Sequence, residues 1–119
     1  MAIKTFKELK VWQKAHELTL YIYKITPKFP LQEKYGLVSQ MRRAAVSIVS
    51  NIVEGFKRKS VKDSIHFYNI SDGSLEELKY QLLLSRDLQY ITEEEYNKGI
   101  ELSEEVGRML HSWSTRQRK

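Results

Sequence analysis

The chain has 119 residues, of which 41% are hydrophobic and 29% are charged, and its formal net charge is +5. This length suits one domain with a single core, and the composition is too apolar for intrinsic disorder and too mixed for a coiled-coil rod. Five glycines and two prolines are too few for the frequent turns of a β-sandwich or barrel, and the lack of cysteine excludes disulfides and thiolate zinc sites. We expect one all-α domain over residues 1–119, located in the cytoplasm, with neither an export signal nor a membrane-spanning segment.

The positive charge is concentrated in the first half of the sequence. Residues 1–62 hold thirteen Lys or Arg against four Glu, a net charge of +9, whereas residues 63–119 have a net charge of −4. A basic surface built from the N-terminal half is compatible with a polyanionic partner such as nucleic acid, although surplus lysine also serves solubility.

The first predicted helix covers about residues 6–25. Its apolar residues recur every three or four positions, as on one face of a helix: Val11, Ala15, Leu18, Ile22 and Ile25. Pro27 and Pro30 prevent its continuation, because proline lacks the amide proton and biases the preceding residue toward an extended conformation. We expect Phe29, between the two prolines, to close one end of the core.

The second predicted helix covers about residues 32–59 and is apolar over an unusually wide arc. Its main apolar row contains Leu37, Met41, Ala44, Ala45, Ile48, Ile52 and Phe56. With Val46, Val49 and Val53 the arc reaches about 200°, whereas one buried face needs little more than ~100°. The excess predicts either a subunit interface with a second copy, formed by Val46, Val49, Val53 and Phe56, or a tilted contact within the chain.

The other side of this helix is a continuous polar stripe: Gln40, Arg43, Ser47, Asn51, Glu54 and Arg58. Such a stripe is more often a hydrogen-bonded seam or a solvated face than a binding site. We interpret Gln40, Ser47, Asn51 and Glu54 as a polar seam.

The third predicted helix covers about residues 61–88, with Ser60 as N-cap and Asp63 as its capping-box partner. Asp72-Gly73-Ser74 inside it is also compatible with a turn, but the apolar phase continues unchanged across the glycine. We therefore predict one long helix in which Gly73 and Ser74 allow a neighbouring helix to approach closely.

The fourth predicted helix covers about residues 92–114. Thr92 is its expected N-cap, and the three glutamates that follow suit the positive end of the helix dipole. The basic tail, residues 115–119, is expected to be frayed.

Catalytic and metal-binding patterns are missing from the sequence. The three histidines lie far apart, and Asp63-x-x-His66 is only half of the paired motif of di-iron bundles. No phosphate-binding loop or nucleophile elbow occurs, and Glu54 is expected to pair with a nearby arginine. We expect no catalytic residues, no metal, no cofactor and no enzyme activity.

The remaining candidate is a set of basic residues suited to phosphates: Arg42, Arg43, Lys57, Arg58, Lys59 and Lys62. An ordinary solvated junction between two helices explains the same pattern. Tyr21, Tyr23 and Tyr35 suit stacking on unpaired bases, although tyrosines at helical spacing usually pack in the core.

The sequence resembles the four-helix bundle proteins encoded by intervening sequences of 23S rRNA genes in three stretches: FKELKVWQKAHEL, FPLQEKYGLVSQMRRAAVSIVSNIVEGFKR and FYNISDGSLEELKYQL. The resemblance runs from Phe6 to about Leu110. Its most specific part is one long motif that contains Gln40, Arg42, Arg43, Ala44, Ser47, Ile48, Asn51, Glu54, Gly55 and Arg58. This family is similar to the accessory protein of diversity-generating retroelements, a basic five-membered ring that binds nucleic acid and a reverse transcriptase.

The resemblance implies an antiparallel up-down-up-down four-helix bundle, a homopentamer and a nucleic-acid-associated role without catalysis. Many relatives carry proline and alanine at the positions of Val49 and Val53. The sequence therefore does not decide whether this chain keeps the bend expected in their second helix. We expect an oligomeric protein that binds RNA or DNA through phosphate contacts. The alternative is an interaction scaffold or accessory subunit that recruits a protein partner through Val46, Val49 and Val53, which we call the valine strip.

Overall fold

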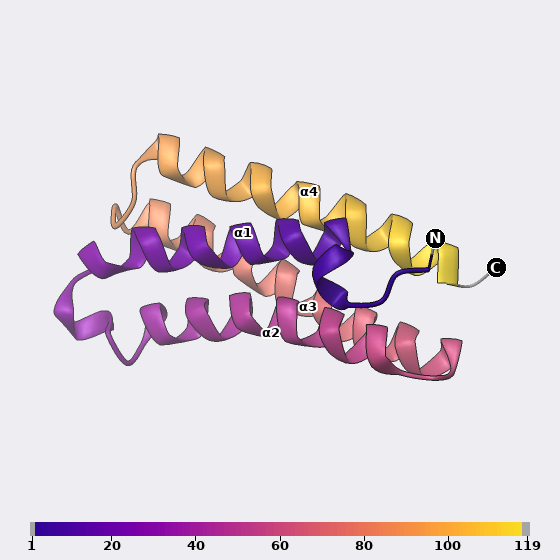
Figure 1. Cartoon of the computed structure of the whole chain (residues 1–119). Helices are drawn as coiled ribbons and strands as arrows, with labels where there is room; N and C mark the ends of the chain where they lie inside the picture. The colour runs from indigo at the N-terminus through magenta and orange to yellow at the C-terminus, as the bar shows by residue number, and fades with distance from the viewer. Residues whose placement is uncertain (1, 118–119) are drawn as a thin grey trace.

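The structure, a computed structural model that describes residues 2–117, consists of four long helices, and no strand occurs among these residues. α1 spans Lys10–Ile25, α2 spans Leu37–Lys57, α3 spans Val61–Asp87 and α4 spans Glu93–Gln117. Consecutive helices pack side by side, α4 packs on α1, and neighbours run in opposite directions (Figure 1). The expected all-α, up-down-up-down four-helix bundle is confirmed.

Small polar residues hold α2 and α3 together. Three hydrogen bonds of 2.8 Å join these helices: Ser64 Oγ to the Gly55 carbonyl, Ser71 Oγ to the Ile48 carbonyl, and Ser47 Oγ with Ser74 Oγ. From one bond to the next, the α2 partner moves back along the chain from Gly55 to Ser47, while the α3 partner moves forward from Ser64 to Ser74. Antiparallel packing requires this order. Serine is short enough to leave the two backbones close together while satisfying polar groups in the interior.

The core lies along the axis of the bundle and receives side chains from every helix. All five apolar residues expected on the inner face of α1 are buried, as are Met41, Ile48 and Ile52 of α2. Phe29 is buried with its ring centroid 5.2 Å from that of Tyr90, so it closes one end of the core as predicted.

Two helices begin later than the sequence pattern suggested. Leu9 is extended, so Phe6–Glu8 forms a separate 3-10 turn, closed by a capping box between Thr5 and Glu8, before α1 begins at Lys10. α2 begins at Leu37 rather than near residue 32, because the backbone of Gly36 leaves the helical region with φ −110° and ψ −109°. Apolar periodicity does not register such breaks.

α3 is one uninterrupted helix, as predicted, but the reason given for Gly73 is wrong. Nothing lies within 4 Å of a Cβ placed at Gly73, whereas a Cβ at Gly55 on α2 would lie 2.4 Å from the ring of Tyr68. Ser74 does face α2, through its hydrogen bond to Ser47. The close approach of the two helices is therefore at Gly55.

The helix caps agree largely with the sequence. Ser60 caps α3 by accepting a hydrogen bond from the Asp63 amide, but the Asp63 side chain forms no return bond with the Ser60 amide, so the predicted capping box is only half formed. Thr92 and Glu95 form a reciprocal capping box at α4. α4 extends to Gln117, past the expected end at residue 114, and residues 118–119 of the predicted tail lie outside the described residues. None of the described helices has the length and apolar character needed to cross a membrane.

We expect Gly55→Ala to destabilise the protein by about 1–2 kcal/mol, because the new methyl group collides with the Tyr68 ring, which is only 2% exposed. Gly73→Ala is the matched control: its methyl group meets open space, and alanine favours the helix by about 1 kcal/mol. Urea unfolding of both variants should move the midpoint in opposite directions. Equal effects of the two substitutions would contradict the close approach at Gly55.

Glu95 ties α4 to the α1–α2 connection. Burial disfavours its charge, but hydrogen bonds from Lys28 and from Thr92 outweigh that effect and hold the pKa of Glu95 below its usual value. The lowered pKa means that the ionised carboxylate adds stability above its ordinary pKa, and that this stability is lost as the pH falls through the folded-state value.

Glu95→Gln keeps an acceptor for the Thr92 amide but removes the charge, so we expect a loss of about 0.5 kcal/mol at pH 7. Thermal unfolding between pH 7 and pH 3 should show the wild type converging on the variant at acid pH. Glu94→Gln, one residue earlier on the exposed surface, is the control. A gap between wild type and Glu95→Gln that stays constant with pH would refute this assignment.

Candidate nucleic-acid interface

Charge is divided between the two sides of the bundle. α1 and α2 together carry six Lys or Arg and two Glu, whereas α3 and α4 carry six Lys or Arg and eleven Asp or Glu. Since α1 and α2 are neighbours, their side of the bundle is positive, and the opposite side is negative. The asymmetry expected from the sequence thus corresponds to two faces of the folded molecule.

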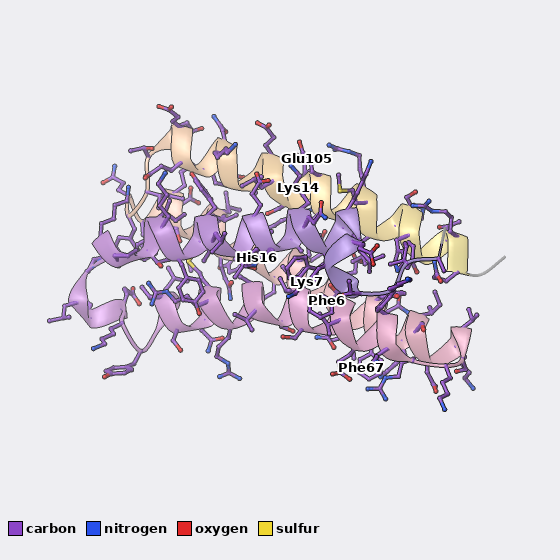
Figure 2. The ribbon with its side chains drawn as sticks, in the orientation of Figure 1. Phe6, Lys7, Lys14, His16, Phe67 and Glu105 are labelled. Carbon is purple, nitrogen blue, oxygen red and sulfur yellow. The ribbon has the colours of Figure 1, made fainter. Side chains whose placement is uncertain are left out.

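Both carboxylates on the basic side already have partners. Glu17 accepts from Lys14 at 3.3 Å, and Glu54 forms an ion pair with Arg58 one turn later. Lys14 also bridges to Glu105 of α4 at 3.0 Å, and these two hydrogen-bonded carboxylates raise its pKa (Figure 2). No unpaired carboxylate on α1 or α2 therefore competes with an approaching anion.

Four basic residues form what we call the junction cluster, at the turn from α2 to α3: Lys57, Arg58, Lys59 and Lys62. All four are exposed. Arg58 is held by Glu54 and by the ring of Phe67, whose centroid lies 4.7 Å from its guanidinium carbon. The three lysines form no ion pair among the described residues, so they are the members free to contact phosphates.

The other two predicted basic residues lie at a groove between α1, α2 and their connection, which we call the α1–α2 groove. Its volume is about 640 Å³, and its lining residues are Tyr23, Lys34, Tyr35, Val38, Ser39, Arg42, Arg43, Val46 and Ser47. Arg42 is half-buried: its guanidinium lies 4.5 Å from the centre of the Tyr23 ring, and its Nε donates to Thr26 Oγ1 at 3.1 Å. Arg43 is exposed. None of the lining residues is acidic.

The structure therefore divides the six predicted residues into two groups. Lys57 comes fourteen positions after Arg43 on α2, which corresponds to about 21 Å along the helix axis. At roughly 3.4 Å per nucleotide, this distance matches phosphates about six nucleotides apart in one strand of a helix.

Of the three candidate stacking tyrosines, only two remain available. Tyr21 packs against the core and its hydroxyl donates to the Glu95 carbonyl at 3.0 Å, and burial raises its pKa. Tyr23 and Tyr35 line the α1–α2 groove, with 42% and 87% of their surface exposed. A basic and aromatic groove is a surface that can hold a phosphate and a base together.

The valine strip of α2 is only partly exposed. Val49 and Phe56 pack against the core of their own chain, Val53 is half-buried, and Val46 is 43% exposed. Contacts within the chain thus cover part of the wide apolar arc, and Val46 is the residue most open to a second molecule.

The polar stripe is partly a seam and partly a surface. Asn51 Nδ2 donates to the Ser47 carbonyl at 2.8 Å, and Ser47 in turn bonds to α3, whereas Gln40 and Glu54 are exposed. No group of three or more His, Cys, Asp or Glu within residues 2–117 is arranged to hold a metal ion. Nothing in this arrangement points to catalysis.

The sequence alone missed Lys34 and Ser39 as members of the groove. The adjacent pair Lys34-Tyr35, basic and aromatic, was a readable signal. The contact between Arg42 and Tyr23 was not, because it depends on how α1 and α2 are aligned across the fold.

Comparison with known proteins agrees with this structure. The model of the 23S rRNA-intervening sequence protein family matches residues 7–112. A solved structure of a protein of unknown function from the S23 ribosomal protein family, from Bacteroides thetaiotaomicron, is similar at 30% identity with a TM-score of 0.78. The similarity covers 87% of this chain and 97% of the other. No curated protein matches the chain.

Proposed function

The chain belongs to the 23S rRNA-intervening sequence protein family, and on this basis we propose that it is a non-enzymatic, cytoplasmic protein that binds RNA, or DNA, through phosphates. The observation that carries the proposal is the basic side of the bundle, on which both carboxylates of α1 and α2 are already paired. The junction cluster and the pair Arg42 and Arg43 make the phosphate contacts.

Binding of this kind is electrostatic and depends little on base sequence. If all six residues contact phosphates, the logarithm of Kd should rise with the logarithm of salt concentration with a slope of about 4 to 5. A weaker slope indicates fewer contacts, and each residue removed from the interface should lower it by about one.

Fluorescence anisotropy with a labelled structured RNA at low salt tests the proposal. We expect Lys59→Glu with Lys62→Glu to weaken binding at least tenfold and to reduce the salt slope by about two, because each substitution replaces a phosphate contact with a repulsion.

The matched control is Lys98→Glu with Arg108→Glu on α4, which changes the net charge equally on the opposite, acidic side. The control variant should lose much less affinity. Equal losses in the two variants would mean that net charge alone attracts RNA, and no binding by the wild type would disprove the function.

We also propose that the protein acts as a homo-oligomer, with a pentamer implied by the family resemblance and with Val46, Val49, Val53 and Phe56 at the subunit contact. The exposure of Val46 supports this placement, since an exposed valine gains from being covered by a second copy. Five copies would carry a charge of +25, a much stronger field for RNA than that of one copy.

Light scattering on the purified protein measures the subunit number directly. Val46→Gln should lower the measured mass toward that of one chain, whereas Ile70→Gln on α3 should not, although Ile70 is exposed to a similar extent, 40% against 43%. A monomeric wild type, or equal effects of the two substitutions, would contradict the proposed subunit contact.

A further inference from the structure

The α1–α2 groove differs from the junction cluster in having aromatic as well as basic side chains. The junction cluster offers cations on an exposed turn, which suits phosphates of any nucleic acid. The groove combines Arg42, Arg43 and Lys34 with the rings of Tyr23 and Tyr35.

Tyr35 is the most exposed large apolar side chain among the described residues, at 87%. Tyr35 does not pack in the core and leaves nearly all of its surface open to solvent. The Lys34 ammonium lies 5.4 Å from the centre of its ring. An exposed ring flanked by a cation is the arrangement that stacks on a base while the cation contacts the adjacent phosphate.

Tyr23 and Arg42 form a second, more rigid platform. Arg42 is oriented by its hydrogen bond to Thr26, which is buried, and its guanidinium lies against the Tyr23 ring. Both a guanidinium plane and an aromatic ring stack on nucleobases. Because the platform is already held in place, little side-chain freedom is lost when a base binds.

The groove is also free of negative charge. No acidic residue lines it, whereas the hollow between α1 and α4, which also contains tyrosine and lysine, includes Glu94 and Glu95. A polyanion therefore meets only positive charge in the groove, whereas in the hollow two carboxylates offset most of the charge of three lysines.

We infer that the α1–α2 groove binds unpaired bases of single-stranded RNA by stacking on Tyr35 and on the Tyr23–Arg42 platform. This inference rests on the proposed nucleic-acid function and makes it more specific. In a duplex the base faces are covered by their neighbours, so the groove contributes to binding of single strands only. The strand then continues along α2 to the junction cluster, which begins about 21 Å from Arg43 along the helix axis.

The test uses the full chain and a 12-nucleotide RNA without self-complementarity that carries one 2-aminopurine, either alone or annealed to its complement. We expect the single strand to bind at least tenfold more tightly than the duplex at equal salt, and 2-aminopurine fluorescence to be quenched on binding because the base stacks. Tyr35→Ala should weaken single-strand binding about 5- to 100-fold and duplex binding less than twofold.

Two control variants separate stacking from other effects. Tyr35→Phe keeps the ring and should bind within about threefold of the wild type. Tyr80→Ala removes a ring that is 60% exposed on α3, away from the groove, and should change neither affinity nor quenching.

Equal losses on single strand and duplex, or no loss in Tyr35→Ala, would overturn the inference while leaving phosphate binding intact. Val46 belongs both to this groove and to the proposed subunit contact, so the inference requires that a second copy on Val46 leaves Tyr23 and Tyr35 open. A change in the mass of Tyr35→Ala by light scattering would overturn it, because Tyr35 itself would then lie in the subunit contact. If the wild type binds neither RNA form, the inference and the proposed function both fail.

Discussion

The close packing of α2 against α3 is the constraint on which the rest of the structure depends. Gly55 leaves room for the Tyr68 ring, and short serine side chains bridge the helices where longer ones would separate them. This contact fixes the rotation of α2 about its own axis. Once Ser47 faces α3 and Met41, Ile48 and Ile52 face the core, the remaining side of α2 turns toward α1 and the surface.

That rotation determines where the functional residues lie. Arg42 meets Tyr23 across the α1–α2 contact, and Val46 and Arg43 open onto the same groove. The motif of α2 therefore serves two purposes: its small and serine residues set the packing, and its arginines line the groove. Substitutions of the small and serine residues of α2 are expected to disturb the groove indirectly, because they would change the rotation of the helix that carries the groove's arginines.

The division of charge follows from topology as well as composition. α1 and α2 are neighbours, and so are α3 and α4, so a sequence with a basic first half becomes a molecule with a basic side. A different order of helices around the bundle would have mixed the charges and removed the field. Glu17 and Glu54 are paired with Lys14 and Arg58, so the net positive charge of this side is carried by its other lysines and arginines.

The sequence determined the helices, the inner faces, the caps at Ser60 and Thr92, and the family, because these depend on local periodicity, on capping chemistry and on a long motif. It did not locate the true starts of α1 and α2, which depend on backbone conformations at Leu9 and Gly36. Only the tertiary structure decided which glycine permits close approach, which of three tyrosines face solvent, and that the six basic residues form two separate groups. Those features depend on how helices align and rotate against one another, and a sequence pattern gives the face of each helix without giving its partner.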